Sequence, residues 1–137
     1  MGLPEHRGYD YKGPYMVSPD QRFVAASIAA SGPSTPGPTK VVIVDARAKK
    51  IISKVGSNDN RYIDGLAWSR DSSWIAVLKH SSRYGRGPID LIGGAFGHPV
   101  PYITYYLEVV DLGGKVFAST KLVSDLRASW GEVVWVD

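Results

Sequence analysis

Short apolar runs separated by polar turns predict an all-β chain. Residues Ile63–Trp68 and Trp74–Leu78 are two such runs, and the polar segment Ser69–Ser73 joins them. Trp, Ile and Val favour a pleated and packed surface, whereas Ser and Asp favour turns because their short side chains bond nearby backbone N–H groups. This stretch therefore predicts a β-hairpin in which both tryptophans are largely buried. Residues Tyr15–Ala30 show the same pattern and predict a similar hairpin.

The remaining strands follow from the same pattern. In the first half, the continuous apolar run Val41–Asp45 predicts a strand that is buried on both faces, and Ile51–Val55 predicts the strand that pairs back with it. In the second half, Tyr102–Asp111 and Val116–Val123 are the corresponding pair, joined by a tight glycine turn. No long segment keeps a helical period, so helices are not expected.

The two halves of the chain repeat each other. Each has a Ser-x-Asp sequence in its first turn, at Ser18–Asp20 and at Ser69–Asp71, and ends its third strand on Asp45 or Asp111. The first offset is 69 − 18 = 51 residues and the second is 111 − 45 = 66 residues, because an insertion at residues 81–101 lengthens the second half. Each half therefore predicts one four-stranded antiparallel unit.

The repeat also predicts the domain organisation. Residues 1–14 form an N-terminal arm, for which Tyr9, Tyr11 and Tyr15 are the expected anchors, and residues 15–137 form a single β domain. That domain divides into a first unit at about residues 15–56, a second unit at about residues 63–123 and an extra C-terminal strand at residues 130–137, whose sequence WGEVVWVD resembles the start of a third copy.

The segments VSPDQRFVAAS, AWSRDSSWIAV, VVIVDARAKK and LEVVDLGGK carry this repeat. Together they resemble β-propeller blades of the WD-repeat and TolB-like kind, over most of residues 15–137. The resemblance implies two four-stranded blades plus one strand, whereas a propeller ring usually closes with about 4 to 8 blades. Three arrangements are therefore open: subunits that complete a propeller by oligomerisation, two sheets that pack as a β-sandwich, or a piece of a longer propeller.

Two long loops mark one side of the predicted blades as the working surface. Loops 31–40 and 81–101 both join the second strand of a unit to the third, and in a propeller such loops emerge on the same side as the connections after the fourth strands. Long loops are mostly functional or disordered. We therefore expect binding through these two loops.

The candidate binding residues are the arginines, aromatic residues and histidine of this side, since Arg, Tyr and Trp are enriched at binding hot spots. They are Arg61, Tyr62, Arg83, Tyr84, Arg86, Phe96, His98, Arg127 and Trp130. For Tyr62, Tyr102 and Trp130, which adjoin strands, filling gaps between the sheets is the stronger alternative. For Arg83–Arg86, in the middle of the loop, binding is the stronger interpretation.

Composition narrows the range of partners. The chain has 137 residues, a formal net charge of +3 and no cysteine. The lack of cysteine excludes a disulfide framework and a thiolate metal site. The basic residues do not gather into a stripe, so nucleic acid is not an expected partner. No apolar run approaches a membrane span and no signal peptide is visible, so we expect a cytoplasmic protein without a membrane partner.

A catalytic constellation is not visible in the sequence. The histidines, His6, His80 and His98, show no metal-ligand spacing, and the carboxylates form no cluster. Asp45, Asp71 and Asp111 recur at repeat positions, which favours turn capping over catalysis. We therefore predict no catalytic residue, no metal and no cofactor.

The function that these observations favour is a non-enzymatic protein-interaction module. It binds a protein partner through loops 31–40 and 81–101, and a homo-oligomer is the second assembly that the repeat allows. Two alternatives stay open. One is a lectin-like oligomeric propeller that binds a glycan or small ligand through Trp and Tyr, and the other is an accessory fragment of a propeller-gated hydrolase.

Overall fold

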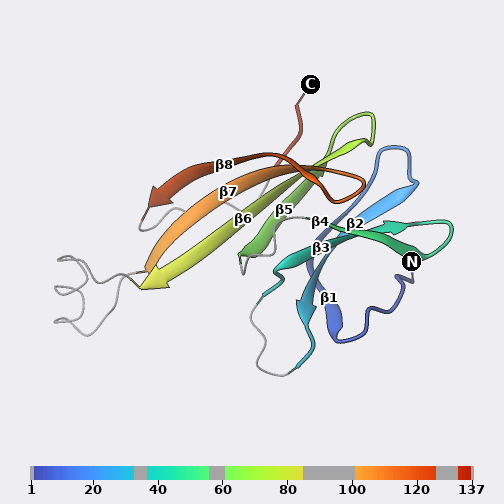
Figure 1. Ribbon diagram of the computed structural model, residues 1–137, viewed down its shortest axis with the longest axis horizontal. Helices are drawn as coiled ribbons and strands as arrows, with labels where there is room; N and C mark the ends of the chain where they lie inside the picture. Colours follow the sequence, from blue (N-terminus) through green and yellow to red (C-terminus); the bar gives the residue numbers. More distant parts are fainter. Residues whose placement is uncertain (1, 33–36, 56–60, 85–100, 126–132, 137) are drawn as a thin grey trace.

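The computed structural model describes residues 2–32, 37–55, 61–84, 101–125 and 133–136, and within these residues it contains eight strands and no helix (Figure 1). Sheet A consists of β1 (Tyr9–Val17), β2 (Phe23–Ala30), β3 (Lys40–Asp45) and β4 (Lys50–Val55). Sheet B consists of β5 (Tyr62–Trp68), β6 (Trp74–Tyr84), β7 (Pro101–Asp111) and β8 (Val116–Asp125). Each sheet is antiparallel in simple sequence order. The predicted all-β fold with two four-stranded units is confirmed.

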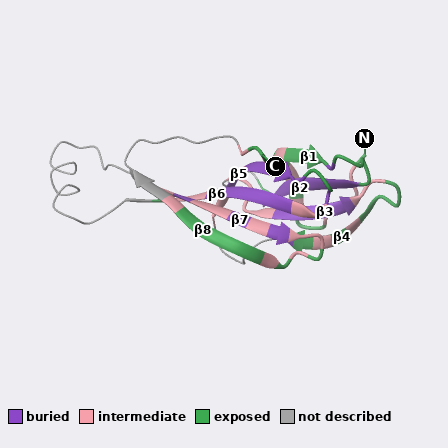
Figure 2. Cartoon of the chain, turned by 90° about the horizontal axis from the view of Figure 1, so that it is seen from above, coloured by how far each residue is buried: buried purple, intermediate pink, exposed green. Residues whose placement is uncertain are grey.

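The two sheets pack face to face around one hydrophobic core. Sheet A contributes Phe23, Ala25, Val41, Ile43 and Val55, and sheet B contributes Ile63, Leu66, Trp68, Ile75, Val77 and Val110. The buried residues lie along the central strands, whereas most of the described part of β8 is exposed (Figure 2). As predicted, β3 is buried on both faces, because the alternate residues Val42 and Val44 pack into a second cluster on the far side of sheet A.

Hydrogen bonds fix how the sheets meet. Trp68 Nε1 donates to the Met16 carbonyl oxygen (2.9 Å), which links β5 to β1. Ser53 Oγ donates to the Leu112 carbonyl oxygen (2.7 Å), which links β4 to the β7–β8 turn. Gly114 in that turn has a φ of +85°, and a Cβ there would lie 2.1 Å from a carbonyl oxygen of β4, so only glycine fits. Equivalent edges of the two sheets therefore lie opposite each other.

The two sheets stack in the same orientation. Side chains alternate along a strand, so each sheet has two faces. The inner face of sheet A, with Phe23 and Ala25, contacts sheet B, and its outer face carries Val24 and Ala26. The repeat offset (75 − 24 = 51) places Val24 of sheet A in correspondence with Ile75, which lies on the inner face of sheet B. The outer face of sheet A is therefore equivalent to the inner face of sheet B.

The first turn of sheet A is built on a buried serine. Ser18 Oγ donates to Asp20 Oδ1 (2.6 Å) and accepts from the Phe23 N–H (3.0 Å). Gln21 has the left-handed φ of 60° that the turn requires. The hydrogen bond from Ser18, followed by that from the Arg22 N–H, holds the pKa of the Asp20 carboxyl below its usual value.

The first turn of sheet B repeats this arrangement. Ser69 Oγ donates to Asp71 Oδ1 (2.7 Å) and accepts from the Trp74 N–H (3.0 Å), and Ser72 has a φ of 63°. Hydrogen bonds from Ser73 and then from Ser69 lower the pKa of the Asp71 carboxyl. The predicted turn role of this aspartate is thus confirmed.

The turns after the third strands also use their aspartates. Asp45 Oδ1 accepts from the N–H groups of Arg47 and Ala48 (2.9 Å each), and Asp111 Oδ1 accepts from the Lys115 N–H (2.9 Å). The predicted turn-capping roles of Asp45 and Asp111 are therefore confirmed.

The first strand begins earlier than the sequence predicts. β1 starts at Tyr9, and its first residues pair with the end of β2 before the register shifts between Tyr11 and Tyr15. Tyr9 and Tyr11 pack with Leu3 on the outer face of sheet A. These aromatic contacts explain the difference. The mixed Gly, Pro and charged composition of residues 1–14 does not indicate a strand, but the packed tyrosines stabilise one.

The second hairpin of sheet B is longer than predicted. Residues 81–84 belong to β6 and residue 101 to β7, although the sequence assigns all of them to loop 81–101. The two strands pair continuously from Trp74 opposite Asp111 to Tyr84 opposite Pro101. The pairing continues because residues 81–84 face Tyr102, Ile103 and Thr104, which are residue types that favour strands.

Two further predictions are corrected at the opposite end of sheet B. Trp68 is buried as predicted, with 7% exposure, but Trp74 is only half-buried because it alternates with Ile75 and faces away from the core. Of the predicted C-terminal strand 130–137, residues 133–136 are described, and they pair with no strand. Trp135 lines the same shallow depression as Trp74.

Candidate functional site

The ends of the strands that lead into the long connections gather on one side of the molecule, which we call the loop side, and the short hairpin turns lie on the other (Figure 1). On the loop side, the Ile63 N–H donates to the Pro38 carbonyl oxygen (2.8 Å), so the described end of loop 31–40 contacts the start of β5. The part of this loop nearest to β3 is therefore fixed against sheet B.

Three rings form a row across sheet B at the loop side. Tyr62 of β5 lies directly opposite His80 of β6, which lies directly opposite Tyr105 of β7. The ring centroids of Tyr62 and His80 are 5.3 Å apart, and those of His80 and Tyr105 are 5.9 Å apart. Cross-strand pairs of this kind hold neighbouring strands in register. The row lies on the outer face of sheet B, because residues alternate from the core residue Val77.

Asp64 completes this cluster. The register of β5 against β6 shifts between Ile63 and Gly65, and the extra residue is Asp64. Its Oδ2 lies 2.6 Å from His80 Nδ1, and both side chains are about one-fifth to one-quarter exposed (19% and 25%). Burial raises the pKa of the Asp64 carboxyl, while the hydrogen bond and charge of His80 act in the opposite direction.

The opposite face of the same strands carries two charged contacts. The Arg61 guanidinium lies 3.4 Å from the centroid of the Tyr106 ring, a cation–π arrangement. One step further into the core, Lys79 Nζ lies 2.6 Å from Glu108 Oε1, and both side chains are only 1% exposed. This buried ion pair joins β6 to β7 between the two sheets, at the base of the long hairpin.

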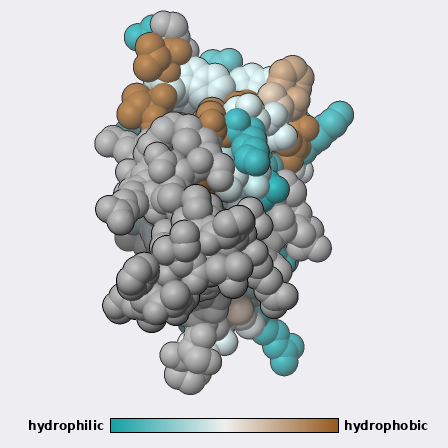
Figure 3. All heavy atoms as spheres, turned by 90° about the vertical axis from the view of Figure 1, so that its left-hand side faces the viewer, coloured by the Kyte–Doolittle hydropathy of each residue, from teal (hydrophilic) through white to brown (hydrophobic). Residues whose placement is uncertain are grey.

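The β6–β7 hairpin reaches beyond β5, and β8 accompanies it as far as the pair of Ile103 and Asp125. The last residue of β6 that pairs with β5 is His80, opposite Tyr62, whereas β6 continues to pair with β7 as far as Tyr84. The strands β6, β7 and β8 therefore extend together past β5 on the loop side (Figure 1). The described residues visible from that direction include both hydrophilic and hydrophobic ones, which do not gather into a single hydrophobic area (Figure 3).

The structure locates only part of the predicted site. Arg61 and Tyr62 lie together at the start of β5, on opposite faces of sheet B, and both are half-buried against it. This agrees with the alternative in which Tyr62 packs on the sheet. Arg83 and Tyr84 belong to β6, and their side chains lie outside the described part. The residues that lie wholly outside the described part are Arg86, Phe96, His98, Arg127 and Trp130.

Sequence reasoning missed Asp64, His80 and Tyr105. The sequence did indicate that Tyr62 and His80 lie near each other, because counting residues outward from the Ser69–Ser73 turn places them close together on neighbouring strands. The bulge at Asp64 breaks this count, and no local pattern announces it. The site is therefore a product of strand register rather than of a sequence motif.

The cluster offers recognition chemistry. In neutral His80 a proton on Nδ1 can be donated to Asp64, which leaves Nε2 as an acceptor for another molecule. Among the residues that the structure describes, no three His, Asp or Glu side chains gather where they would hold a metal ion. The arrangement therefore provides aromatic surface, one carboxylate and one imidazole, without a metal centre in the described part.

No protein-family model and no curated protein matches the sequence. Within the described ranges there is no helix long and apolar enough to cross a membrane.

Proposed function

We propose that this protein is a non-enzymatic interaction module that binds a protein partner through its loop side. The observation that carries the proposal is the continuous pairing of β6 with β7 past the last residue of β6 that β5 reaches. A paired hairpin that extends past β5, with β8 beside it, can present its connecting loop to a partner at a fixed position. The buried pair of Lys79 and Glu108 strengthens this proposal, because it ties the two strands together where the projection begins.

The scaffold that we propose for this function is a pair of propeller-like blades. The two sheets stack in the same orientation, and their first strands, β1 and β5, are neighbours joined by the Trp68–Met16 hydrogen bond. Successive propeller blades have the same relation, since each blade packs its face on the next. This support is geometric and concerns the scaffold alone.

The alternative of glycan binding receives less support. Sugars stack on open aromatic faces, but Tyr105 is only 4% exposed and Tyr62 is half-buried. The Tyr62–His80–Tyr105 row is therefore not an open stacking platform. For the hydrolase alternative, the described residues offer the Asp64–His80 pair and no nucleophile bonded to it.

The experiment that tests this proposal removes the loop and keeps the hairpin. In the variant, residues 85–100 are replaced by Asn-Gly, a two-residue turn that suits paired strands. Immobilised wild type and variant are incubated with lysate, captured proteins are identified by mass spectrometry, and the leading candidate is purified for a binding titration. We expect the wild type to bind this protein and the variant to lose at least tenfold in affinity, which is about 1.4 kcal/mol.

The matched control is Arg47→Glu, which changes an exposed residue on the turn side. It should bind the purified partner as the wild type does. Equal affinity of the loop-replaced variant and the wild type would reject binding through loop 81–101, and equal loss in the control would show that the contact is not confined to the loop side.

A further inference from the structure

Two equivalent surfaces of the chain are covered very differently. Tyr15 and Leu66 occupy the same position of the repeat (66 − 15 = 51), yet Tyr15 is 66% exposed and Leu66 only 3%. The next equivalent pair is Val17, 41% exposed, and Trp68, 7% exposed. Sheet A covers Leu66 and Trp68, whereas among the described residues it is the N-terminal ones around Leu3 that pack on the outer face of sheet A.

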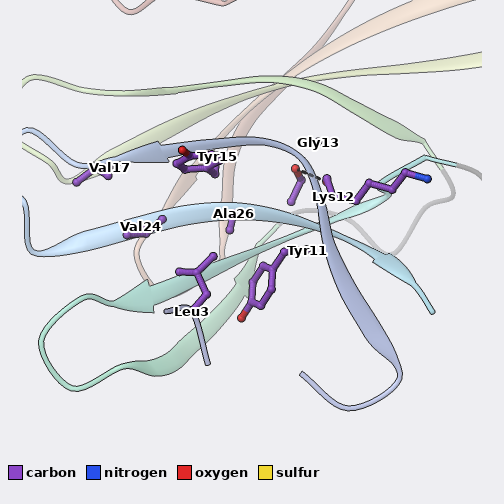
Figure 4. Close-up of a pocket in the computed structure, with 9 residues that line it drawn as sticks. Leu3, Tyr11, Lys12, Gly13, Tyr15, Val17, Val24 and Ala26 are labelled. Carbon is purple, nitrogen blue, oxygen red and sulfur yellow. Dashed lines mark hydrogen bonds between the residues drawn. The ribbon is translucent and has the colours of Figure 1, made fainter. Parts of the chain in front are cut away.

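A pocket marks the incompletely covered area. It has a volume of about 410 Å³, and its lining includes the apolar and aromatic residues Leu3, Tyr11, Tyr15, Val17, Val24 and Ala26, which we call the tail surface. Tyr11 and Leu3 lie side by side below the strand β2, while Tyr15 and Val17 come from β1 above it (Figure 4). An apolar cavity of about 150 Å³ is enough to hold benzene. This pocket therefore has room for aromatic side chains.

The chain also exposes part of the outer face of sheet B. The outer face of sheet B is equivalent to the inner face of sheet A, by the same repeat offset. At the turn end it exposes Phe117 (72%), whose ring lies 4.8 Å from that of Trp74, and the nearby C-terminal segment exposes Val134 (67%) and Val136 (83%). We call Phe117, Val134, Trp135 and Val136 the head surface. Trp135 lies in the same depression as Trp74.

Within one chain, the inner face of sheet A already binds the inner face of sheet B. The head surface adjoins Trp74, which occupies the position of Phe23 in the first of these faces (74 − 23 = 51), and the tail surface is equivalent to the second. We propose that copies of this chain associate head to tail, with the head surface of one copy on the tail surface of the next and an exposed aromatic such as Phe117 entering the pocket. This inference does not depend on the proposed loop-side function.

Charge and symmetry favour a second copy as the occupant. Among the described residues that line the pocket, Lys12 is the one that is charged, and its side chain points away from the tyrosines (Figure 4). The depression beside the head surface contains Arg70 and Asp71, whose charges are opposite. Neither surface therefore repels the other. Because the two surfaces differ, the contact is heterologous and leads to a ring or to a filament.

The test uses two variants that each damage one surface. Tyr15→Asp places a charge in the tail surface, and Phe117→Asp places one in the head surface; both side chains are exposed, so both variants should fold. Light scattering behind a sizing column should show a wild-type mass above 14.9 kDa that rises with concentration. Each variant alone should stay at 14.9 kDa.

An equimolar mixture of the two variants makes the decisive sample. The intact head of Tyr15→Asp can bind the intact tail of Phe117→Asp, and the complex cannot grow, so the mixture should reach twice 14.9 kDa and stop. A wild type that stays at 14.9 kDa at every concentration would overturn the proposal, and so would a mixture of variants that fails to dimerise.

Two controls accompany this test. Ile52→Asp changes an exposed apolar residue of β4 that belongs to neither surface, and it should associate as the wild type does. Circular dichroism checks that each variant keeps its strands. If either variant fails to fold, the pair Val17→Asp and Val134→Asp repeats the mixing test with the same expected masses.

Discussion

Sheets A and B share the geometry of their first turns, but one pair of fully buried positions is apolar in sheet A and charged in sheet B. In sheet A these positions hold Ile28 and Val42, both 0% exposed, and in sheet B the repeat offsets (79 − 28 = 51 and 108 − 42 = 66) place Lys79 and Glu108 there. The apolar pair lies beneath the Tyr9 and Tyr11 rings, whereas the ion pair lies between the sheets. The same backbone position is therefore filled either by aliphatic packing or by a salt bridge.

The difference indicates what each position does. A buried ion pair is weak evidence for stability, because the cost of removing both charges from water often exceeds their attraction. Such a pair can instead specify a single register, since any slip of the strands would leave two buried charges apart. Lys79 and Glu108 lie where β6 and β7 begin to project, so we interpret the pair as the device that sets the register of the hairpin.

The largest expected effect comes from breaking this pair. Lys79→Met removes the cation that lies 2.6 Å from the buried Glu108 carboxylate and should lower the free energy of unfolding by about 3–5 kcal/mol. The double variant Lys79→Ile, Glu108→Val copies sheet A and should be close to the wild type or more stable. Urea denaturation followed by tryptophan fluorescence measures all three. A double variant as unstable as the single one would show that the pair contributes stability rather than register.

The two tryptophans of the central hairpin separate the inner face of sheet B from its outer face. Trp68→Ala should cost about 3–5 kcal/mol, because the ring is buried between the sheets and donates a hydrogen bond to Met16. Trp74→Ala should cost clearly less, since Trp74 is half-buried on the outer face. The same denaturation experiment compares them. A change below about 1 kcal/mol for Trp68→Ala would contradict its burial.

The serines in the first turn of each sheet test whether the two turns, which share one geometry, also contribute equally to stability. Ser18→Ala and Ser69→Ala each leave a backbone N–H, of Phe23 or of Trp74, without its buried acceptor. Each variant should lose about 1–3 kcal/mol, and the two losses should agree closely. Thermal denaturation of both variants provides the comparison. A large difference between the two losses would mean that the turns contribute unequally to stability despite their equal geometry.

The smallest expected effect is on stability at acid pH, and it has opposite signs on the two sides of the molecule. On the turn side, the pKa values of Asp20 and Asp71 are lowered by hydrogen bonds from Ser18 and Ser73, so the stability that these groups contribute is complete above the unfolded value of 3.8 and is lost as pH falls below it. On the loop side, burial raises the pKa of Asp64, so its contribution decreases as pH rises above 3.8 through the folded value.

Melting temperatures across the acid range separate these two contributions. Asp71→Asn should flatten the loss of stability below pH 3.8, and Asp64→Asn should flatten the opposite slope above it. Identical pH profiles for the two variants would contradict the difference between the two sides.

Much of the fold could be predicted because its determinants are local. The Ser-x-Asp turns, the apolar run of β3 and the repeat itself are visible in the sequence, and they yield the strand order of both sheets. The length of the second hairpin was not predictable in this way, since residues 81–84 have the composition of a loop and become strand only by pairing with β7.

The candidate site was less predictable than the fold, for a related reason. Arg61 and Tyr62 were predicted because they belong to residue types common at binding sites. Asp64 and His80 meet across two strands at a bulge, and neither residue carries a local signal of the contact. The register of a hairpin decides which side chains meet, and that register depends on pairing along the whole strand.

The two sheets are successive repeats that stack in the same orientation, and the Trp68 indole reports on this stacking directly. In a two-dimensional NMR spectrum, the indole N–H should show contacts to Met16 and Phe23 of sheet A and should exchange slowly with solvent, because it donates to the Met16 carbonyl oxygen at 2.9 Å. Rapid exchange, with contacts only to residues of sheet B, would contradict the stacking and with it the equivalence of the two faces.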